Sequence, residues 1–286
     1  MTTRASAYSE ITMKIVEELE KGRHPWSPGW DRDTIPMSLP RRWTGDSYQG
    51  INVLVLWMSA AKNGFTSSRW FTYRQARNVG GQVRRGERST GVIYYENRVR
   101  LNDDGEEEEH RLLRNYRVFN ADQIDNLPEP FLAPDSPQSV NAKSEEIDRL
   151  IGRTGATISE RRNARDAFYL VSADRIVMPH RDSFSPVERF YSVLMHELIH
   201  WTGNPSRLAR LSRDDTDRDY AFEELVAEIG SCFACASLGL VPDIGNSASY
   251  IRDWADRLKA DHKVIFKAAG AAQKAADFLL GRMQSA

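Results

Sequence analysis

Residues 185–203 read SPVERFYSVLMHELIHWTG, and this order of residues predicts one amphipathic helix together with its two ends. Ser185 followed three residues later by Glu188 matches a capping box, and Pro186 suits the first position of a helix. Gly203 is the residue type that most often ends a helix in the left-handed conformation. We therefore expect a helix that starts at Ser185 and stops at Gly203.

The same segment contains a pattern typical of a metal site. His196 and His200 are four residues apart, so both imidazoles lie on one helical face and can reach the same divalent ion. Glu197 is then placed to contact a water bound to that ion rather than the ion itself. Chance is the alternative, since such a pattern arises in roughly one chain in a hundred of this length. The preceding apolar residues and the acidic helix that follows favour a metal site, with zinc as the expected ion.

A second helix, expected over residues 220–238, offers a third ligand. A catalytic zinc needs three protein ligands and one open position for water, and a glutamate from a neighbouring helix is a common third ligand. Glu224 and Glu228 share one helical face. We predict that Glu224 binds the metal, that Glu228 orients a ligand histidine from behind, and that Glu223 points elsewhere. The alternative, in which all three are solvated acids, is weakened by the apolar residues between them.

Length and composition restrict the class of protein. The chain has 286 residues, of which 41% are apolar and 28% are charged, with a formal net charge of −1, as in one large or two ordinary globular domains. We find no apolar run of membrane-spanning length and no apolar core of a signal peptide, so we expect a cytoplasmic protein without a membrane partner. Cys232 and Cys235 are expected to be small core residues rather than a redox pair or half of a zinc site.

The segment 69–100 differs in charge from the rest of the chain. It holds eight arginines against two glutamates, with aromatic residues between them. Arginines neutralise phosphates and rings stack on exposed bases, so this pattern favours single-stranded nucleic acid. For any single residue, the simpler interpretation is an aromatic ring packed in the core or an arginine solvated at the surface. The clustering of aromatic residues and arginines in one segment is what favours DNA binding. The residues predicted to contact single-stranded DNA are Trp43, Tyr48, Arg69, Trp70, Tyr73, Arg74, Arg84 and Arg85.

The remaining patterns predict an α+β protein of two domains. Apolar periodicity predicts helices at residues 8–20, 51–62 and 144–151, and alternation predicts strands at 92–100, 110–120, 157–159, 167–171 and 174–179. The acidic run 106–109 is expected to be a solvated hairpin tip. Four prolines in residues 127–137 predict a linker. We therefore expect a DNA-binding domain at 1–127, a proline-rich linker at 128–142 and a metal-binding domain at 143–286.

Longer motifs in both halves resemble one known family. The histidine helix and YAFEELVAE (residues 220–228) resemble the zincin-like metallopeptidase domain of the ArdC antirestriction family, which is similar in layout to the SprT-type DNA-associated proteases. The motifs YQGINVL (48–54), SRWFT (68–72), GGQVRRG (80–86) and RVFNADQI (117–124) resemble the single-stranded-DNA-binding domain of that family and of plasmid primases. The resemblance implies a plasmid- or phage-linked protein that escorts incoming single-stranded DNA past host restriction.

Two functions are consistent with these expectations. In the first, the protein binds single-stranded DNA and is a zinc metallopeptidase, in which Glu197 takes a proton from the attacking water and returns it to the leaving amine. The family does not define the protein substrate. In the alternative, the protein is a non-proteolytic DNA-binding shield, and its metal site is structural or vestigial.

Overall fold

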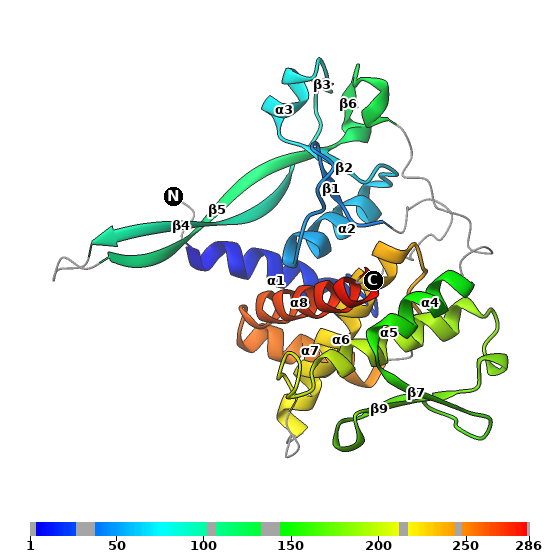
Figure 1. The fold of residues 1–286 in the computed structure, drawn as a ribbon. Helices are drawn as coiled ribbons and strands as arrows, with labels where there is room; N and C mark the ends of the chain where they lie inside the picture. Colours follow the sequence, from blue (N-terminus) through cyan, green and yellow to red (C-terminus); the bar gives the residue numbers. More distant parts are fainter. Residues whose placement is uncertain are drawn as a thin grey trace.

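The chain folds into a helical core with small sheets at both ends (Figure 1). The computed structural model describes residues 4–26, 38–101, 107–132, 144–211, 217–243 and 248–284. In the described part, helices predominate, and the strands form three separate sheets. The expected α+β class is confirmed.

The N-terminal lobe, residues 38–132, combines two sheets with two helices. Its sheets have strand orders β1-β2-β5-β4 and β3-β6. The long antiparallel pair β4 and β5 runs in register from Thr90 opposite Val118 to Leu101 opposite Glu107, and it projects from the body as a ribbon (Figure 1). The elements of the lobe are β1 (Arg41–Arg42), α2 (Ile51–Asn63), β2 (Arg69–Phe71), α3 (Tyr73–Asn78), β3 (Gln82–Val83), β4 (Thr90–Leu101), β5 (Glu107–Asn120) and β6 (Ile124–Asp125).

Two predictions for this lobe differ from the structure or concern residues that lie partly outside the described ranges. Residues 107–109 of the acidic run belong to strand β5 rather than to a hairpin tip, because the ladder continues up to Glu107; residue 106 lies outside the described residues. Within the expected linker, Glu129–Phe131 forms a short 3-10 turn, and residues 133–142 lie outside the described residues. The domain boundaries stay a prediction.

The C-terminal lobe, residues 144–284, packs a three-stranded sheet of order β7-β9-β8 against a group of helices. β7 is parallel to β9, whereas β8 is antiparallel to it. All three strands overlap the predicted ones. The elements are α4 (Ser144–Thr154), β7 (Thr157–Arg161), β8 (Phe168–Leu170), β9 (Arg175–Pro179), α5 (Glu188–Thr202), α6 (Asp217–Leu238), α7 (Ala248–Ala260) and α8 (Val264–Gln284).

The ends of α5 differ from the predicted ones. The helix begins at Glu188, the Ser185–Pro186 peptide bond is cis, and no side chain caps the first turn, so the predicted capping box is wrong. Gly203 is right-handed, with φ −76°, so the predicted left-handed stop is also wrong. The glycine is needed for space instead, because a Cβ there would lie 3.0 Å from the His200 carbonyl oxygen and 3.0 Å from Leu211 Cγ.

The first helix, α1 (Arg4–Glu20), joins the two halves of the chain. It packs along α7 and runs beside α8 (Figure 1). Thr12 Oγ1 donates a hydrogen bond to the His262 carbonyl at 2.7 Å, and the Trp26 ring meets the Trp254 ring with centroids 5.6 Å apart. One apolar core therefore extends through both lobes and α1.

Helix α6 is buried along most of its length. Cys232 and Cys235 are fully buried free thiols, which confirms the expectation that they are core residues. Burial raises the pKa of both thiols well above the ordinary value for cysteine, so both stay protonated and inert. Among the described helices, none combines the length and the apolarity that crossing a membrane requires.

Candidate nucleic-acid surface and metal centre

The predicted DNA-contacting residues of the N-terminal lobe divide into exposed and buried side chains. Trp70 and Tyr48 are 1% and 3% exposed, so their prediction as DNA contacts is wrong. Trp70 lies on β2, the strand between β1 and β5, where its ring packs on Phe65 with centroids 6.0 Å apart. Tyr48 lies beneath the Arg42 guanidinium, and burial raises its pKa above the ordinary value for tyrosine. Both rings therefore belong to the apolar core.

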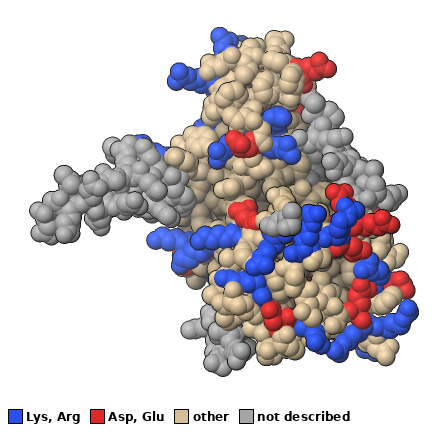
Figure 2. Space-filling view, viewed as in Figure 1, with Lys and Arg blue, Asp and Glu red and all other residues tan. Residues whose placement is uncertain are grey.

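The other predicted residues reach the surface. Trp43 and Tyr73 are 37% and 51% exposed, and Arg69 is half-buried, with Nη1 donating to the Trp43 carbonyl at 3.5 Å. Blue side chains lie at the tip of the lobe around α3, and others form a band across the middle of the molecule, over α8 (Figure 2). Of the predicted arginines, Arg74, Arg84 and Arg85 are exposed.

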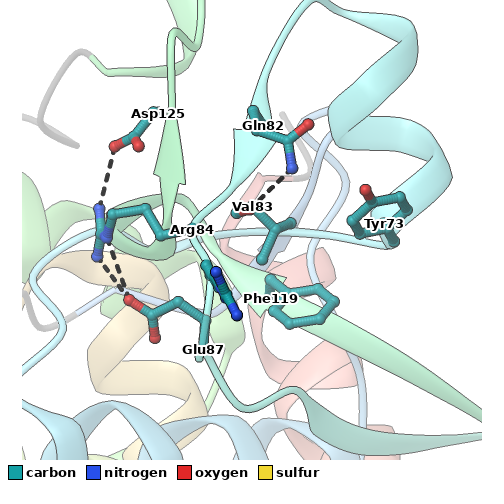
Figure 3. A pocket seen from close by; sticks show the side chains of 8 residues that line it. Tyr73, Gln82, Val83, Arg84, Glu87, Phe119 and Asp125 are labelled. Atoms are coloured by element: carbon teal, nitrogen blue, oxygen red, sulfur yellow. Dashed lines mark hydrogen bonds and ion pairs between the residues drawn. The ribbon is translucent and has the colours of Figure 1, made fainter.

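A pocket of about 760 Å³ opens beside α3, between β3, β6 and the end of β5 (Figure 3). Arg84 is held there by two acids: its Nη2 is 2.8 Å from Glu87 Oε1, and its Nη1 is 3.5 Å from Asp125 Oδ1. The lining residues are Tyr73, Gln82, Val83, Arg84, Arg85, Glu87, Phe119 and Asp125. This pocket joins several of the predicted DNA-contacting residues in one surface feature.

Helices α5 and α6 lie side by side and bring three potential metal ligands together. His196 and His200 extend from α5, with their Nε2 atoms 3.1 Å apart. Glu224 of α6 faces both, with Oε2 3.6 Å from His196 Nε2 and Oε1 3.2 Å from His200 Nε2. One ligand atom from each residue lies within 4.8 Å of the others, a cluster small enough for one ion.

The electrostatics of this cluster suit a cation. Burial opposes a charge on His200, but its hydrogen bonds to Glu223 and Glu224 raise its pKa to about 10. Burial likewise opposes ionisation of Glu224, yet the hydrogen bonds to His196 and His200 hold its pKa well below the ordinary value. A field that stabilises a proton between these groups also stabilises a divalent ion, and imidazole with carboxylate is a common donor set for such ions. The residues present therefore fit a metal.

A second acid lies behind His200, contrary to expectation. Glu223, predicted to point elsewhere, has Oε1 3.3 Å from His200 Nδ1. Arg210 holds this carboxylate in turn, with Nη2 and Nε donating to it at 2.9 and 3.1 Å. Glu228, the residue predicted for this role, is buried on the same helix. Burial opposes a charge on His196, but the hydrogen bond to Glu224 and the nearby charge of Glu228 raise the pKa of His196.

The other side chains near the cluster differ in exposure. Glu197 is 6% exposed and follows His196 on α5, as its predicted role requires. Tyr220 also lies near the cluster, although the sequence did not predict it as a site residue. It is 52% exposed, and partial burial together with the Glu224 carboxylate raises its pKa above the ordinary value for tyrosine. Its spacing of four residues from Glu224 was the available signal.

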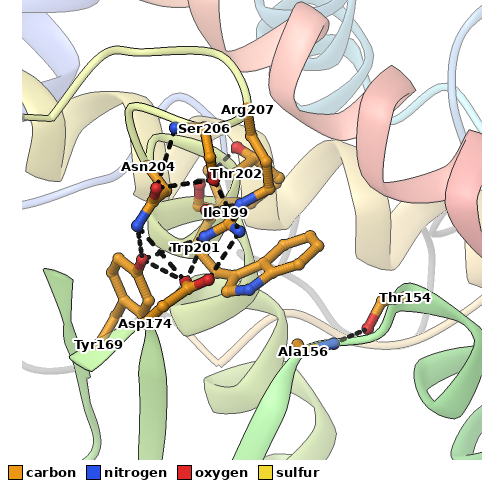
Figure 4. Close-up of polar contacts among 10 residues, drawn as sticks. All are labelled: Thr154, Ala156, Tyr169, Asp174, Ile199, Trp201, Thr202, Asn204, Ser206 and Arg207. Atoms are coloured by element: carbon orange, nitrogen blue, oxygen red, sulfur yellow. Dashed lines mark hydrogen bonds and ion pairs between the residues drawn. The ribbon is translucent and has the colours of Figure 1, made fainter. Parts of the chain in front are cut away.

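A polar network fixes the C-terminal end of α5 (Figure 4). Arg207 Nη1 donates to Asp174 Oδ2 at 2.9 Å, and its guanidinium lies 3.9 Å from the centroid of the Trp201 ring. Tyr169 Oη donates to Asp174 Oδ1 at 2.7 Å, and Asn204 Nδ2 donates to Tyr169 Oη at 2.7 Å. The hydrogen bond from Arg207 holds the pKa of Asp174 below its ordinary value. The network ties the helix that carries both histidines to strand β8 and to the turn before β9.

Comparison with known proteins identifies the family. The family model for the N-terminal domain of the anti-restriction factor ArdC matches residues 5–120, and that for a zincin-like metallopeptidase matches residues 145–271. The crystal structure of the antirestriction ArdC protein from the R388 plasmid, in its metal-free form, is 43% identical, covers 96% of this chain and 97% of its own, and superposes with a TM-score of 0.85. The chain belongs to the ArdC antirestriction family.

Other relatives of this ArdC family member extend the comparison. The Mn(II)-bound structure of the R388 protein is 41% identical, covers 97% of this chain and 98% of its own, and gives a TM-score of 0.83. An uncharacterized protein of Sinorhizobium fredii is 32% identical over 99% of this chain and 94% of its own length. A DNA primase TraC of Escherichia coli is 36% identical over 98% of this chain, which spans only 20% of the primase. The zincin-like match contains the whole histidine and glutamate cluster.

Proposed function

We propose that this ArdC family protein binds single-stranded DNA in the cytoplasm through its N-terminal lobe, protects incoming plasmid DNA from restriction, and is a metal-dependent peptidase. The observation that carries the peptidase proposal is the partly buried cluster of His196, His200 and Glu224 beside Glu197. The match to a zincin-like metallopeptidase supports the same reaction. The exposed rings and arginines of the N-terminal lobe support DNA binding.

The proposed mechanism assigns a task to each side chain of the centre. A divalent ion held by His196, His200 and Glu224 would polarise a peptide carbonyl and acidify a water molecule. Glu197 accepts the proton of that water as it attacks the carbonyl, and then gives the proton to the leaving amine. Glu223 holds His200 in position by accepting a hydrogen bond from Nδ1.

Two ions are candidates for the centre. Two imidazoles and one carboxylate form a donor set that zinc prefers, and we propose zinc as the resident ion. The R388 relative is described in an Mn(II)-bound form, so manganese is the second candidate. Titrating the purified protein with each ion, with Glu224→Gln and Glu228→Gln for comparison, tests the assignment. We expect the Glu224 variant to bind either ion far more weakly, whereas an equal loss in both variants would contradict the choice of Glu224 as the ligand.

The peptidase proposal is tested with Glu197→Gln in the full chain. We expect this variant to bind metal and DNA like the wild type and to lose at least 100-fold in cleavage of fluorescently labelled casein, because the proton acceptor is gone. Equal cleavage by wild type and variant would contradict the assigned role.

The same variant distinguishes the peptidase from the DNA shield. Protection of transferred plasmid DNA in cells expressing Glu197→Gln is the second measurement. Loss of protection would show that evasion of restriction requires proteolysis. Full protection would instead favour the alternative function, a DNA-binding shield for which the peptidase is dispensable.

A further inference from the structure

The pocket beside α3 combines an aromatic wall with an electrically balanced interior (Figure 3). Among its lining residues, Tyr73 is 51% exposed, Phe119 is half-buried, and Val83 is a buried apolar side chain. It is an open surface pocket, and its volume of about 760 Å³ lies within the range of sites that hold one small molecule. The pocket therefore offers flat apolar surface to a ligand of that size.

The charges of the pocket largely satisfy one another. Glu87 Oε1 accepts from Arg84 Nη2 at 2.8 Å, and Oε2 accepts from Gln123 Nε2 at 2.9 Å, so this carboxylate is fully engaged. Asp125 is paired with the same arginine. The lining holds two arginines and two acids, so its formal charge is zero. A ligand with several negative charges, such as a nucleoside triphosphate, would meet both carboxylates inside.

One cation of the lining has no such partner. Arg85 lines the pocket, is exposed, and forms no ion pair within the described part of the chain. A neutral aromatic group thus fits against the rings of the pocket, while a negative charge attached to it fits beside Arg85. A nucleobase with its backbone phosphate has this combination of properties, since rings stack on bases and arginines neutralise phosphates.

We propose that this pocket receives one unstacked base of single-stranded DNA, with Tyr73 stacking on the base and Arg85 contacting the adjacent phosphate. The inference rests on the proposed DNA binding and adds a discrete one-base site to it. The pocket thereby fixes the register of the strand on the lobe, which a uniformly basic groove does not do.

The test compares two fluorescein-labelled ten-mers, one of thymidine and one of abasic sites, which have the same phosphates but differ in bases. We expect Tyr73→Ala in the full chain to weaken thymidine binding about 5- to 100-fold while leaving abasic binding unchanged. Tyr73→Phe keeps the ring and should bind like the wild type. Arg85→Ala should weaken both oligomers and reduce the slope of log K against log salt by about 0.7.

The control is Phe168→Ala, which removes a ring of similar exposure from β8 in the other lobe and should change neither affinity. If the wild type binds neither oligomer, the proposed DNA binding fails, and the one-base site with it. If the wild type binds thymidine and Tyr73→Ala binds it equally well, only the one-base site is overturned, and the pocket belongs to another ligand class such as a protein side chain. Equal weakening on both oligomers would also overturn it, because Tyr73 would then contact backbone.

Discussion

His200 connects the metal centre to the loop behind it through its two ring nitrogens. Nε2 lies 3.2 Å from Glu224 Oε1, whereas Nδ1 lies 3.3 Å from Glu223 Oε1 on the opposite edge of the ring. Burial opposes ionisation of Glu223, but the hydrogen bonds to His200 and Arg210 lower its pKa. In the neutral imidazole that binds an ion, the proton therefore belongs on Nδ1, facing this carboxylate. The lone pair of Nε2 then points to the position that an ion would occupy.

Arg210→Ala tests this arrangement. The substitution leaves Glu223 buried without its guanidinium partner, so the carboxylate no longer holds the imidazole in one orientation. We expect metal affinity to fall about 10- to 100-fold in a Mn(II) or Zn(II) titration. The matched control is Arg189→Ala, which breaks an ion pair with Asp243 at the surface and should leave affinity unchanged. An unaltered affinity in Arg210→Ala would mean that Glu223 does not position the ligand.

Residues of the centre differ in how readily the sequence reveals them. The histidine pair and Glu224 are predictable because helical periodicity alone fixes which side chains share a face. Glu223 was misassigned because its direction depends on how α6 is rotated against α5, and Arg210 lies in an irregular loop without a periodic pattern. Trp70 was misassigned because an aromatic residue in a basic segment does not reveal which side of the strand is covered.

At the scale of elements, the contact between α5 and α6 depends on a glycine. A Cβ at Gly230 would lie 3.0 Å from Ile199 Cγ2 and 3.3 Å from two further atoms of that fully buried side chain. The absence of a side chain lets the two helices approach closely enough for Glu224 to face both histidines. Close packing of two helices therefore contributes to the geometry of the centre.

Gly230→Ala and Gly270→Ala form a matched pair of helix substitutions. Alanine at Gly230 must displace Ile199. We therefore expect urea unfolding to show a free energy of unfolding lower by about 1–2 kcal/mol, although alanine has the better helix propensity. At Gly270 of α8, an added Cβ would meet no neighbouring atom within 4 Å. Alanine there should therefore raise the free energy of unfolding by up to about 1 kcal/mol. A stabilised Gly230→Ala would show that α5 can move away without cost.

Long elements were predictable and short ones were not. The periodic segments that predicted α2 and the β4–β5 pair are long enough for the pattern to dominate. Strands β1, β3 and β6 have two residues each, and only pairing with distant residues defines them, as where Arg41 lies opposite Arg69. At the start of α5, Phe184 packs on Phe190 with ring centroids 5.5 Å apart, and the local capping pattern is not formed.

At the scale of the whole molecule, the sequence suggests two domains, yet their cores are continuous. Helix α1 belongs to the N-terminal half of the chain, but its buried residues Ile15, Val16 and Leu19 pack in the core shared with the C-terminal helices. The backbone N–H of Gly50, before α2, donates to Gln273 Oε1 of α8 at 2.9 Å. Sequence patterns mark segments by local composition, so they do not reveal such a shared interface.

This continuity predicts a single cooperative unfolding transition. Because the apolar surface of α1 is covered by the C-terminal helices, separating residues 1–127 from these helices would expose fully buried residues of α1, at a cost of about 25 cal/mol per Å². We expect urea transitions followed by far-UV circular dichroism and by tryptophan fluorescence to coincide, and a fragment of residues 1–127 to be less structured than the same residues in the full chain. Two separated transitions, or an isolated fragment with full native helicity, would show that the lobes fold independently. DNA binding and metal binding would then be properties of separable domains, whereas one transition would mean that each lobe needs the other to stay folded.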